Sequence, residues 1–403
     1  MASCTSNEEA TTIVQGDLQQ PTVTWPLSSN LASHVDGIND FALDALRLVD
    51  EASGGKDIII SPLSLVYTLA IAADGAAGPT RNEITATLGF APGNAHSLAS
   101  LCASLIRHYD DDGGVLNAAN AMFVRHGLRV GDDFRTRLVD CYDAMVEEAD
   151  FSSAEAMEEI NRWVATQTDG MIPRLEGGVD ASTAICLLSA VSMKAKWEKP
   201  FTTSLTRNSR FLKADGTAAV WLPTMQHTDM MAYASTKDAQ FLELPYKGGR
   251  YAMTICLPHS TRRPLEALKG TTGSGLLRQC LDMDPTLVNA CVPRFATSCQ
   301  KDLSAALSDM GISSALDPTK AEFPHIASKG GIFLSTLLQK AVINVNEEGT
   351  VAAAATVIGG ETSTGDAVTP VRFTADHPFL YIITDKQASV IIFAGIYYGD
   401  TAD

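Results

Sequence analysis

Apolar residues recur at helical spacing through the first half of the chain. Between positions 36 and 50 they stand three or four residues apart, as on one face of a helix: Ile38, Phe41, Ala42, Ala45, Leu46 and Val49. The same period predicts further helices over 63–74, 81–88, 98–109, 132–142 and 153–168. Turn signals at Ser61-Pro62 and at 75–79 separate the early segments from one another.

Strand-like runs dominate from position 184 onward. They are predicted over 185–191, 240–246, 251–257, 287–295, 341–346, 379–384 and 389–396, with one late helix over 301–310. Helices mixed with antiparallel-type strands predict an α+β fold. The sequence shows no internal repeat and no linker beyond position 30. We therefore expect a flexible polar segment over 1–30 and a single domain over 31–403.

Composition narrows the range of partners. The 403 residues are 45% hydrophobic and 19% charged, which is enough apolar material for a core and too little charge for disorder. The formal net charge is -17. Nucleic acids, heparin-type polyanions and anionic membrane surfaces attract clustered Lys and Arg, so this balance argues against all three. No apolar run approaches the roughly 18 residues that a membrane span requires.

The cysteines and histidines form no recognisable reactive pattern. Besides Cys4 there are seven cysteines, and none belongs to a Cys-x-x-Cys pair: Cys102, Cys141, Cys186, Cys256, Cys280, Cys291 and Cys299. The eight histidines are scattered, without metal-ligand spacing. No nucleophile elbow, phosphate-binding loop or dinucleotide fingerprint occurs. We predict no metal site, no cofactor and no enzymatic activity.

The N-terminus allows two interpretations. Ala2-Ser3-Cys4 resembles the cleavage end of a bacterial lipoprotein signal, although no apolar stretch of signal-peptide length precedes it. If Met1 stands in place of a removed leader, Cys4 is a candidate lipidation site and the polar segment over 5–30 is a tether. A location outside the cell or on a bacterial surface would follow, with the membrane reached only through that lipid. The alternative is an ordinary cytosolic start with an incidental cysteine.

Residues 347–358 are the most informative segment. They read Glu-Glu-Gly-Thr-Val followed by four alanines, and alanine favours a helix. However, a strand-like run over 341–346 precedes them, and a stretch rich in Gly, Ser and Thr follows over 359–369. The context therefore favours a segment of small residues that leads into an exposed loop and could itself become a strand.

Eight motifs, in order from position 61 to position 380, resemble the serpin family. They are Ser61-Pro62-Leu63-Ser64, the run over 75–80, Leu88-Gly89-Phe90, the run over 117–123, the run over 160–164, Lys194-Ala195-Lys196-Trp197, Pro293-Arg294-Phe295 and the run over 377–380. The resemblance covers the chain from about residue 35. It implies the serpin fold, with helices packed around three β-sheets, a large central five-stranded sheet among them, and an exposed reactive-centre loop over about 347–372.

The same resemblance implies a function. A protease cleaves the reactive-centre loop, becomes esterified to it, and is trapped when the freed loop inserts into the central sheet as a new strand. The hinge of that loop would be Glu347, Gly349, Thr350, Ala352, Ala353, Ala354 and Ala355. Small uncharged hinge residues permit fast insertion, because none carries a charge that must be desolvated. We therefore expect an inhibitory, monomeric protein whose partner is a serine protease bound covalently one to one.

The position of the scissile bond depends on how the loop is counted. Forward from Glu347, the family spacing puts the cut between Ser363 and Thr364; backward from Pro378, it falls nearer Ala367. Glu361, Thr362 and Asp366 are alternates. The window over 361–368 contains no Lys, Arg or large apolar residue, so trypsin-like and chymotrypsin-like pockets would stay unfilled. Elastase-like or subtilisin-like proteases are expected, and an acid-specific or cysteine protease is the alternative.

Two departures from the family pattern coincide. The family's shutter region is represented here by Ser61, Ser64, Ser189 and Gln339, and its breach tryptophan by Trp197. Many serpins carry Asn at the position of Ser189 and His at that of Gln339. Our hypothesis is that Gln339 reaches Ser189 or Ser61 and replaces the lost hydrogen bond. The alternative is a shutter with one polar bond fewer.

A non-inhibitory serpin-fold protein that acts in storage, as a carrier or as a chaperone is the competing function. The small residues of the hinge argue against it.

Overall fold

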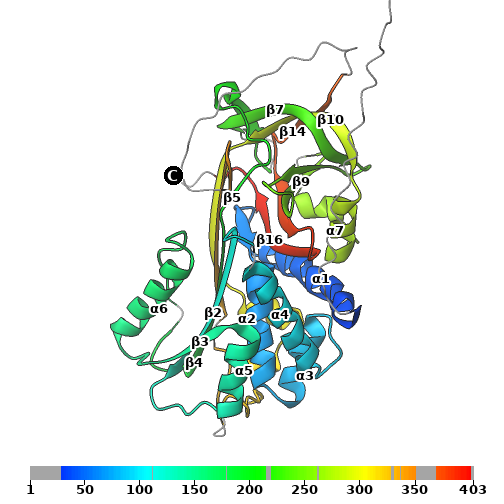
Figure 1. Cartoon of the computed structure of the whole chain (residues 1–403). Helices are drawn as coiled ribbons and strands as arrows, with labels where there is room; N and C mark the ends of the chain where they lie inside the picture. The colour runs from blue at the N-terminus through cyan, green and yellow to red at the C-terminus, as the bar shows by residue number, and fades with distance from the viewer. Residues whose placement is uncertain are drawn as a thin grey trace, which may run out of the picture.

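The computed structural model describes residues 29–110, 112–177, 179–214, 219–260, 263–327, 331–335, 337–350 and 369–400. Most of the helices lie around the lower half of the molecule (Figure 1). The α-helices in these ranges are α1 (Ser29–Glu51), α2 (Pro62–Gly75), α3 (Gly78–Thr87), α4 (Ala95–Asp110), α5 (Asp132–Tyr142), α6 (Ala154–Gln167), α7 (Gly273–Leu281) and α8 (Ser304–Asp309). Short 3₁₀ turns are η1 (Thr203–Leu205), η2 (Pro264–Leu268) and η3 (Ser314–Leu316).

The strands form three sheets, as the resemblance predicted. The strands before residue 240 are β1 (Ile58–Ile60), β2 (Leu116–Arg125), β3 (Ala144–Ala149), β4 (Ile185–Met193), β5 (Ala195–Lys196), β6 (Arg207–Leu212), β7 (Ala219–Ser235) and β8 (Ala239–Pro245). The later strands are β9 (Tyr251–Pro258), β10 (Asp284–Pro293), β11 (Phe295–Asp302), β12 (Leu338–Asn346), β13 (Gly349–Thr350), β14 (Val371–Thr374), β15 (Phe379–Asp385) and β16 (Val390–Tyr397).

The largest sheet has nine strands in the order β1-β16-β15-β9-β8-β7-β10-β14, with β6 also paired to β7. A second sheet has the order β11-β12-β13-β5, and a third has the order β3-β2-β4. The pairs β2–β3 and β10–β14 are parallel, and the other ladders are antiparallel.

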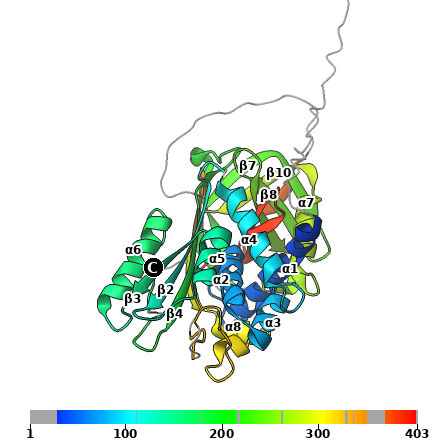
Figure 2. The same ribbon diagram turned by 60° about the horizontal axis from the view of Figure 1, so that its bottom comes forward.

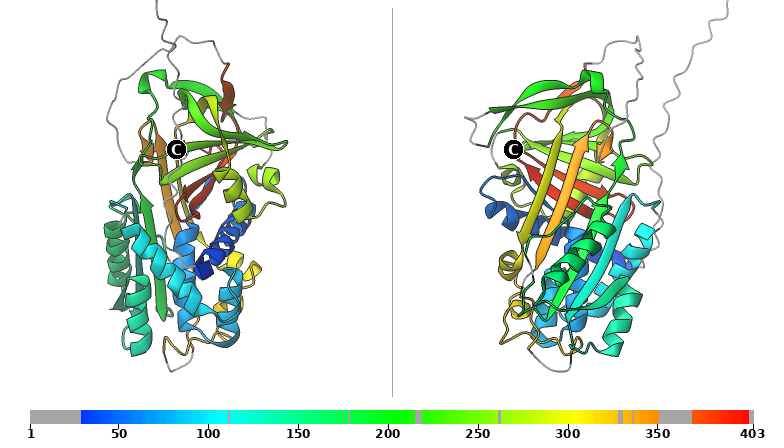
Figure 3. Two further views of the ribbon diagram at one scale, coloured as in Figure 1. Left: turned by 45° about the vertical axis from the view of Figure 1, so that its right-hand side comes forward. Right: turned by 90° about the vertical axis from the view of Figure 1, so that its left-hand side faces the viewer.

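The expected central sheet is divided into two hydrogen-bonded groups. Strand β12 lies next to β4, but the described residues contain no ladder between them. The two groups meet at one end, where β13 pairs with β12 on one side and with β5 on the other, and β5 follows β4 in the chain after Lys194. Figure 3 shows β11 and β12, in yellow and orange, running together along this part of the molecule. A seam therefore separates β4 from β12.

Helix α2 lies behind the seam. All of its residues are buried, and the helix contacts β4, α4 and β16. A helix that is apolar all round belongs in the core of a protein. Ser61 caps its N-terminus by accepting a hydrogen bond from the Ser64 amide, and Pro62 occupies the first turn, where its missing N–H costs nothing. Helix α6 packs against the β3-β2-β4 group, where Phe123 of β2 meets Trp163 edge to face (Figure 2).

Several predicted boundaries were wrong for local reasons. The strand predicted over 287–295 is two strands, β10 and β11, which are divided at Arg294. The helix predicted over 301–310 begins only at Ser304, because the Asp302 carboxylate accepts from the Ser304 amide and ends β11 there. Helix α1 begins at Ser29, inside the segment expected to be flexible. The periodicity did not detect β7 or α7.

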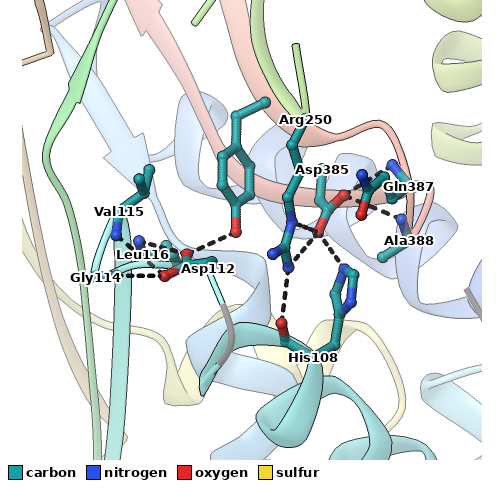
Figure 4. A network of polar contacts seen from close by, with 10 residues as sticks. His108, Asp112, Gly114, Val115, Leu116, Arg250, Asp385, Gln387 and Ala388 are labelled. Atoms are coloured by element: carbon teal, nitrogen blue, oxygen red, sulfur yellow. Dashed lines mark hydrogen bonds and ion pairs between the residues drawn. The ribbon is translucent and has the colours of Figure 1, made fainter. Parts of the chain in front are cut away.

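A buried polar network fixes α4 to the largest sheet (Figure 4). The Asp385 side chain is fully buried, and Oδ2 lies 2.7 Å from His108 Nε2 and 3.3 Å from Arg250 Nε. Its other oxygen accepts from the amides of Gln387 and Ala388 at 2.8 and 3.0 Å. Arg250 also donates to the His108 carbonyl. The end of α4, the start of β9 and the end of β15 are thereby held together.

Removal of the Asp385 carboxylate should destabilise the protein strongly. Asp385→Ala leaves the Arg250 guanidinium without its buried counter-charge and removes the hydrogen-bond partner of His108 Nε2, so we expect a loss of about 3–5 kcal/mol in the free energy of unfolding. Urea denaturation followed by circular dichroism measures this. Lys237→Ala, which removes an exposed ion pair with Asp238, is the matched control and should leave the midpoint unchanged. Equal midpoints for both variants would contradict the structural role of the network.

Candidate functional site

The candidate site lies where β12 turns into β13. Glu347 and Glu348 form the turn, and the Asn346 side chain accepts from the Glu348 amide at 2.9 Å. Thr350 then pairs with Val345 of β12 on one side and with Ala195 of β5 on the other. The first residues of the predicted hinge therefore already form a short strand between two others.

The close approach of β5 requires a glycine at position 349. Its backbone has φ 152°, and a Cβ atom built there would lie 2.0 Å from the Ala195 carbonyl oxygen. No L-residue with a side chain can occupy this position while β13 stays paired with β5. The glycine predicted as a pivot thus also permits close approach of two backbones.

Thr350 is almost fully buried, at 2% exposure, and its hydroxyl lies 2.6 Å from that of Tyr246. The Tyr246 ring stacks on Trp197 with ring centroids 4.5 Å apart. Trp197 in turn donates from its indole to the Asn346 carbonyl at 2.9 Å and from its backbone to the Glu348 carbonyl. Burial raises the pKa of the Tyr246 phenol well above its usual range, which keeps the hydroxyl available as a donor.

The Glu347 carboxylate is held by the guanidinium of Arg294. Arg294 donates from Nε to both carboxylate oxygens of Glu347, at 2.8 and 2.7 Å, and Thr206 donates its hydroxyl to the same carboxylate. Burial disfavours the charged form, but the hydrogen bonds from Arg294 and Thr206 outweigh burial and lower the pKa of Glu347. The carboxylate is therefore ionised at neutral pH and anchors the turn.

The four predicted shutter residues meet at the N-terminus of α2. Gln339 of β12 accepts from the Ser61 amide at 3.2 Å and donates to the Ser61 carbonyl at 2.8 Å. Ser64 donates to the Ser189 carbonyl of β4 at 2.8 Å. One helix end thus binds both strands that border the seam. Among the described residues the Ser189 hydroxyl has no partner, so Gln339 reaches Ser61 but not the Ser189 side chain.

The family model described as serpin (serine protease inhibitor) matches residues 36–399. The chain belongs to the serpin family.

Relatives span most of this serpin. An uncharacterized serpin-like protein of Thermococcus kodakarensis is 31% identical over 370 residues, which cover 90% of this chain and 84% of the relative. Plasminogen activator inhibitor 1 of Neovison vison is 30% identical over 368 residues, which cover 88% and 90%. The crystal structure of the thermophilic serpin tengpin in its native state superposes with a TM-score of 0.83. The superposition covers 93% of this chain and 95% of tengpin, and the two sequences are 23% identical.

The structure corrects one expectation about the serpin hinge. Sequence reasoning placed the whole hinge outside the sheet, whereas Gly349 and Thr350 are already paired as β13. The remaining predicted positions lie outside the described residues: Ala352, Ala353, Ala354, Ala355, Glu361, Thr362, Ser363, Thr364, Asp366, Ala367 and Cys4.

Sequence reasoning missed two partners of the hinge. Tyr246 was assigned only to the end of a strand, and Arg294 only to a family motif, and neither position carries a local signal for its contact. Both contact residues that are distant along the chain, so no periodicity or spacing could reveal them. Trp197 was predicted, and the structure places it between Tyr246 and the turn at Glu347 and Glu348.

Other kinds of chemistry have no support in the described part of the chain. No group of three or more His, Cys, Asp or Glu side chains there could hold a metal ion. The described cysteines are all free thiols. No described helix has the length and apolarity to cross a membrane.

The hydroxyl of Tyr246 should hold β13 in place. Tyr246→Phe removes one buried hydrogen bond and no packing, so local opening should speed amide exchange at Gly349 and Thr350 by about two- to tenfold. Hydrogen–deuterium exchange read by mass spectrometry measures it. Tyr67→Phe is the matched control, because the fully buried Tyr67 hydroxyl has no partner among the described residues. Unchanged exchange in Tyr246→Phe would refute the role of this bond.

Proposed function

We propose that this serpin is a covalent, suicide-type inhibitor of serine proteases. One observation carries the proposal: β13 is already seated between β12 and β5 at one end of the open seam. The loop that follows Thr350 therefore continues from a strand that has begun to enter the sheet. Insertion of the rest of the loop would extend an existing ladder and would not have to start a new one.

The reaction requires a bond to be broken before insertion. The protease serine hydroxyl attacks the carbonyl of the scissile residue, the peptide C–N bond breaks, and the new amino terminus leaves. The loop is then joined to the protease by an ester. Hydrolysis of the ester by water releases a cleaved substrate, whereas earlier insertion of the loop displaces and distorts the protease and keeps the ester intact.

The edges of the seam favour insertion energetically. Strands β4 and β12 can each pair with an incoming strand, and every backbone hydrogen bond gained contributes about 0.5–1.5 kcal/mol. The entering side chains after Val351 are Ala352 to Ala355, which are small and uncharged. They neither clash nor need desolvation. A relative that is 30% identical is named plasminogen activator inhibitor 1, and that name further supports an inhibitory function for this chain.

We propose Ser363–Thr364 as the scissile bond, with Glu361, Thr362, Asp366 and Ala367 as alternates. Small residues in this window suit the shallow pockets of elastase-like or subtilisin-like serine proteases. An acid-specific protease would instead cut after Glu361 or Asp366.

A gel tests the mechanism directly. After incubation with an elastase-like or a subtilisin-like protease, we expect an SDS-stable species heavier than either partner, and mass spectrometry should locate the cut within 361–368. Cleaved protein without a complex for every protease tried would favour the non-inhibitory alternative. A cut outside the window would overturn the specificity argument and leave the mechanism intact.

Thr350→Arg should convert the inhibitor into a substrate. Thr350 is 2% exposed and contacts the Tyr246 hydroxyl, so an arginine there would have to bury a guanidinium at a cost of several kcal/mol. The yield of complex should therefore fall at least about tenfold while cleavage continues. Thr136→Arg makes the same substitution at an exposed position on α5 and should inhibit normally. Full complex formation by Thr350→Arg would contradict insertion through this hinge.

We also propose that the protein acts outside a bacterial cell, held to the surface by a lipid on Cys4. The three residues Ala2-Ser3-Cys4 and the polar segment behind them support this location. Mass spectrometry of protein isolated from the cells that produce it should find Cys4 as the N-terminal residue, carrying a diacylglyceryl group. An unmodified Met1 or Ala2 at the N-terminus would refute the proposal.

A further inference from the structure

Most of the exposed large apolar side chains that the structure describes lie on elements toward one end of this serpin. Among the described residues, the large hydrophobic side chains with high exposure are Val139, Leu205, Trp221, Met230 and Val371. All but Val139 lie on β7, on β14 or in the turn η1 just before β6. Figure 1 shows β7, β10 and β14 together at the top of the molecule, far from α5, which carries Val139.

Trp221 is the most exposed of them, at 69%. It lies directly opposite Arg210 in the β6–β7 ladder. Their neighbours Phe211 and Leu222 are buried, and because side chains alternate along a strand, Arg210 and Trp221 point outward. The next outward pair, Asn208 and Pro223, is also exposed. The outer surface of β6 and β7 around Trp221 and Arg210 is called the Trp221 face below.

Arg210 gives this face a positive charge. The exposed Arg210 makes no ion pair or hydrogen bond with any residue that the structure describes, so its guanidinium is available to a partner. Trp and Arg together are the residues most enriched at energetic centres of protein interfaces. Their combination on an open sheet face fits a partner with an apolar groove beside a carboxylate.

The Trp221 face lies close to the start of the reactive-centre loop. The Pro223 carbonyl accepts from the Arg294 amide at 2.8 Å, and Arg294 binds Glu347 through its side chain. Thr206, just before β6, binds Glu347 as well. Trp221 stands two residues beyond Pro223, about 7 Å along the strand. Val371, on the C-terminal side of the loop, begins β14 of the same sheet.

A protease bound to this loop would reach the Trp221 face. A protease domain of about 220 residues has a radius of gyration of about 17 Å, more than twice the step of about 7 Å from Trp221 to Pro223, whose carbonyl binds Arg294. The occupant of the face is therefore expected to be the same protease that attacks the loop. A second, independent partner would compete with it for space.

We propose that the Trp221 face is a second contact site for the target protease. Trp221 enters an apolar groove on the protease, and Arg210 pairs with an acidic side chain beside that groove. The inference rests on the proposed inhibitory function and deepens it. The loop determines which bond is cut, and the Trp221 face determines which of the proteases able to cut that bond associate fastest with the inhibitor. Contacts of this kind act before cleavage, on the encounter between the two proteins.

The rate at which the serpin and a protease associate tests the proposal. With a protease that forms the SDS-stable complex with the wild type, we would measure the second-order rate constant of inhibition for Trp221→Ala and Arg210→Ala. Each should fall at least about fivefold, while the fraction trapped and the site of cleavage stay the same. Arg210→Ala should also weaken the dependence of the rate on salt.

Val139→Ala is the matched control. It removes an apolar side chain of 55% exposure at the opposite end of the molecule and should leave the rate unchanged. Trp221→Phe keeps an aromatic ring and should retain most of the rate, and unaltered thermal midpoints would show that all four variants are folded.

The outcomes separate the two proposals. No stable complex with any protease, for the wild type included, refutes the inhibitory function. Stable complexes at wild-type rates for both variants refute the Trp221 face alone. A monomer–dimer change on Trp221→Ala with an unchanged rate would show that the face binds a second copy, and would likewise overturn the proposal.

Discussion

The pairing of β13 with β12 and β5 is the constraint on which the rest of the structure depends. It connects β12 to β5, which follows β4 in the chain after Lys194, so it lies where the two halves of the central sheet meet. The strand is held by a buried hydroxyl pair at Thr350 and Tyr246, and the turn before it by a partly exposed ion pair between Glu347 and Arg294. In this arrangement β4 and β12 stay close but unpaired. The proposed inhibition would draw on the backbone hydrogen bonds that their unpaired edges can still form.

The N-terminus of α2 limits the seam at a second place. Ser61 binds Gln339 of β12, and Ser64 binds the backbone of β4, so the two strands are bridged through a helix and not through each other. A strand that enters between them must loosen this bridge, and its strength therefore sets part of the barrier to insertion. Within the part of the chain that the structure describes, the Gln339 side chain bonds to backbone atoms of Ser61, and the Ser189 hydroxyl has no partner. The barrier is thus built from few polar bonds, each of modest net free energy.

Under the proposed inhibitory function, recognition and capture of a protease would use different parts of this protein. Capture would depend on the seam and the hinge. Recognition would depend on the outer surface of β6 and β7, where the exposed Trp221 lies opposite Arg210. The two regions meet at Arg294, which binds Glu347 with its side chain and Pro223 with its backbone amide.

The sequence by itself determined most elements, the family pattern, and the set of small residues that a mobile strand needs. Helices such as α1 carry a local apolar periodicity, and strands such as β16 carry an unbroken apolar run, so neighbouring residues suffice to predict them. The boundary errors at Arg294 and Asp302 arose where a single side chain or backbone contact ended an element. Only the tertiary structure decided that Gly349 and Thr350 are already paired, that Tyr246 and Arg294 hold them, and that Trp221 points outward. The physical reason is that these contacts join residues such as Tyr246 and Thr350, 104 positions apart, which no local pattern links until the chain has folded.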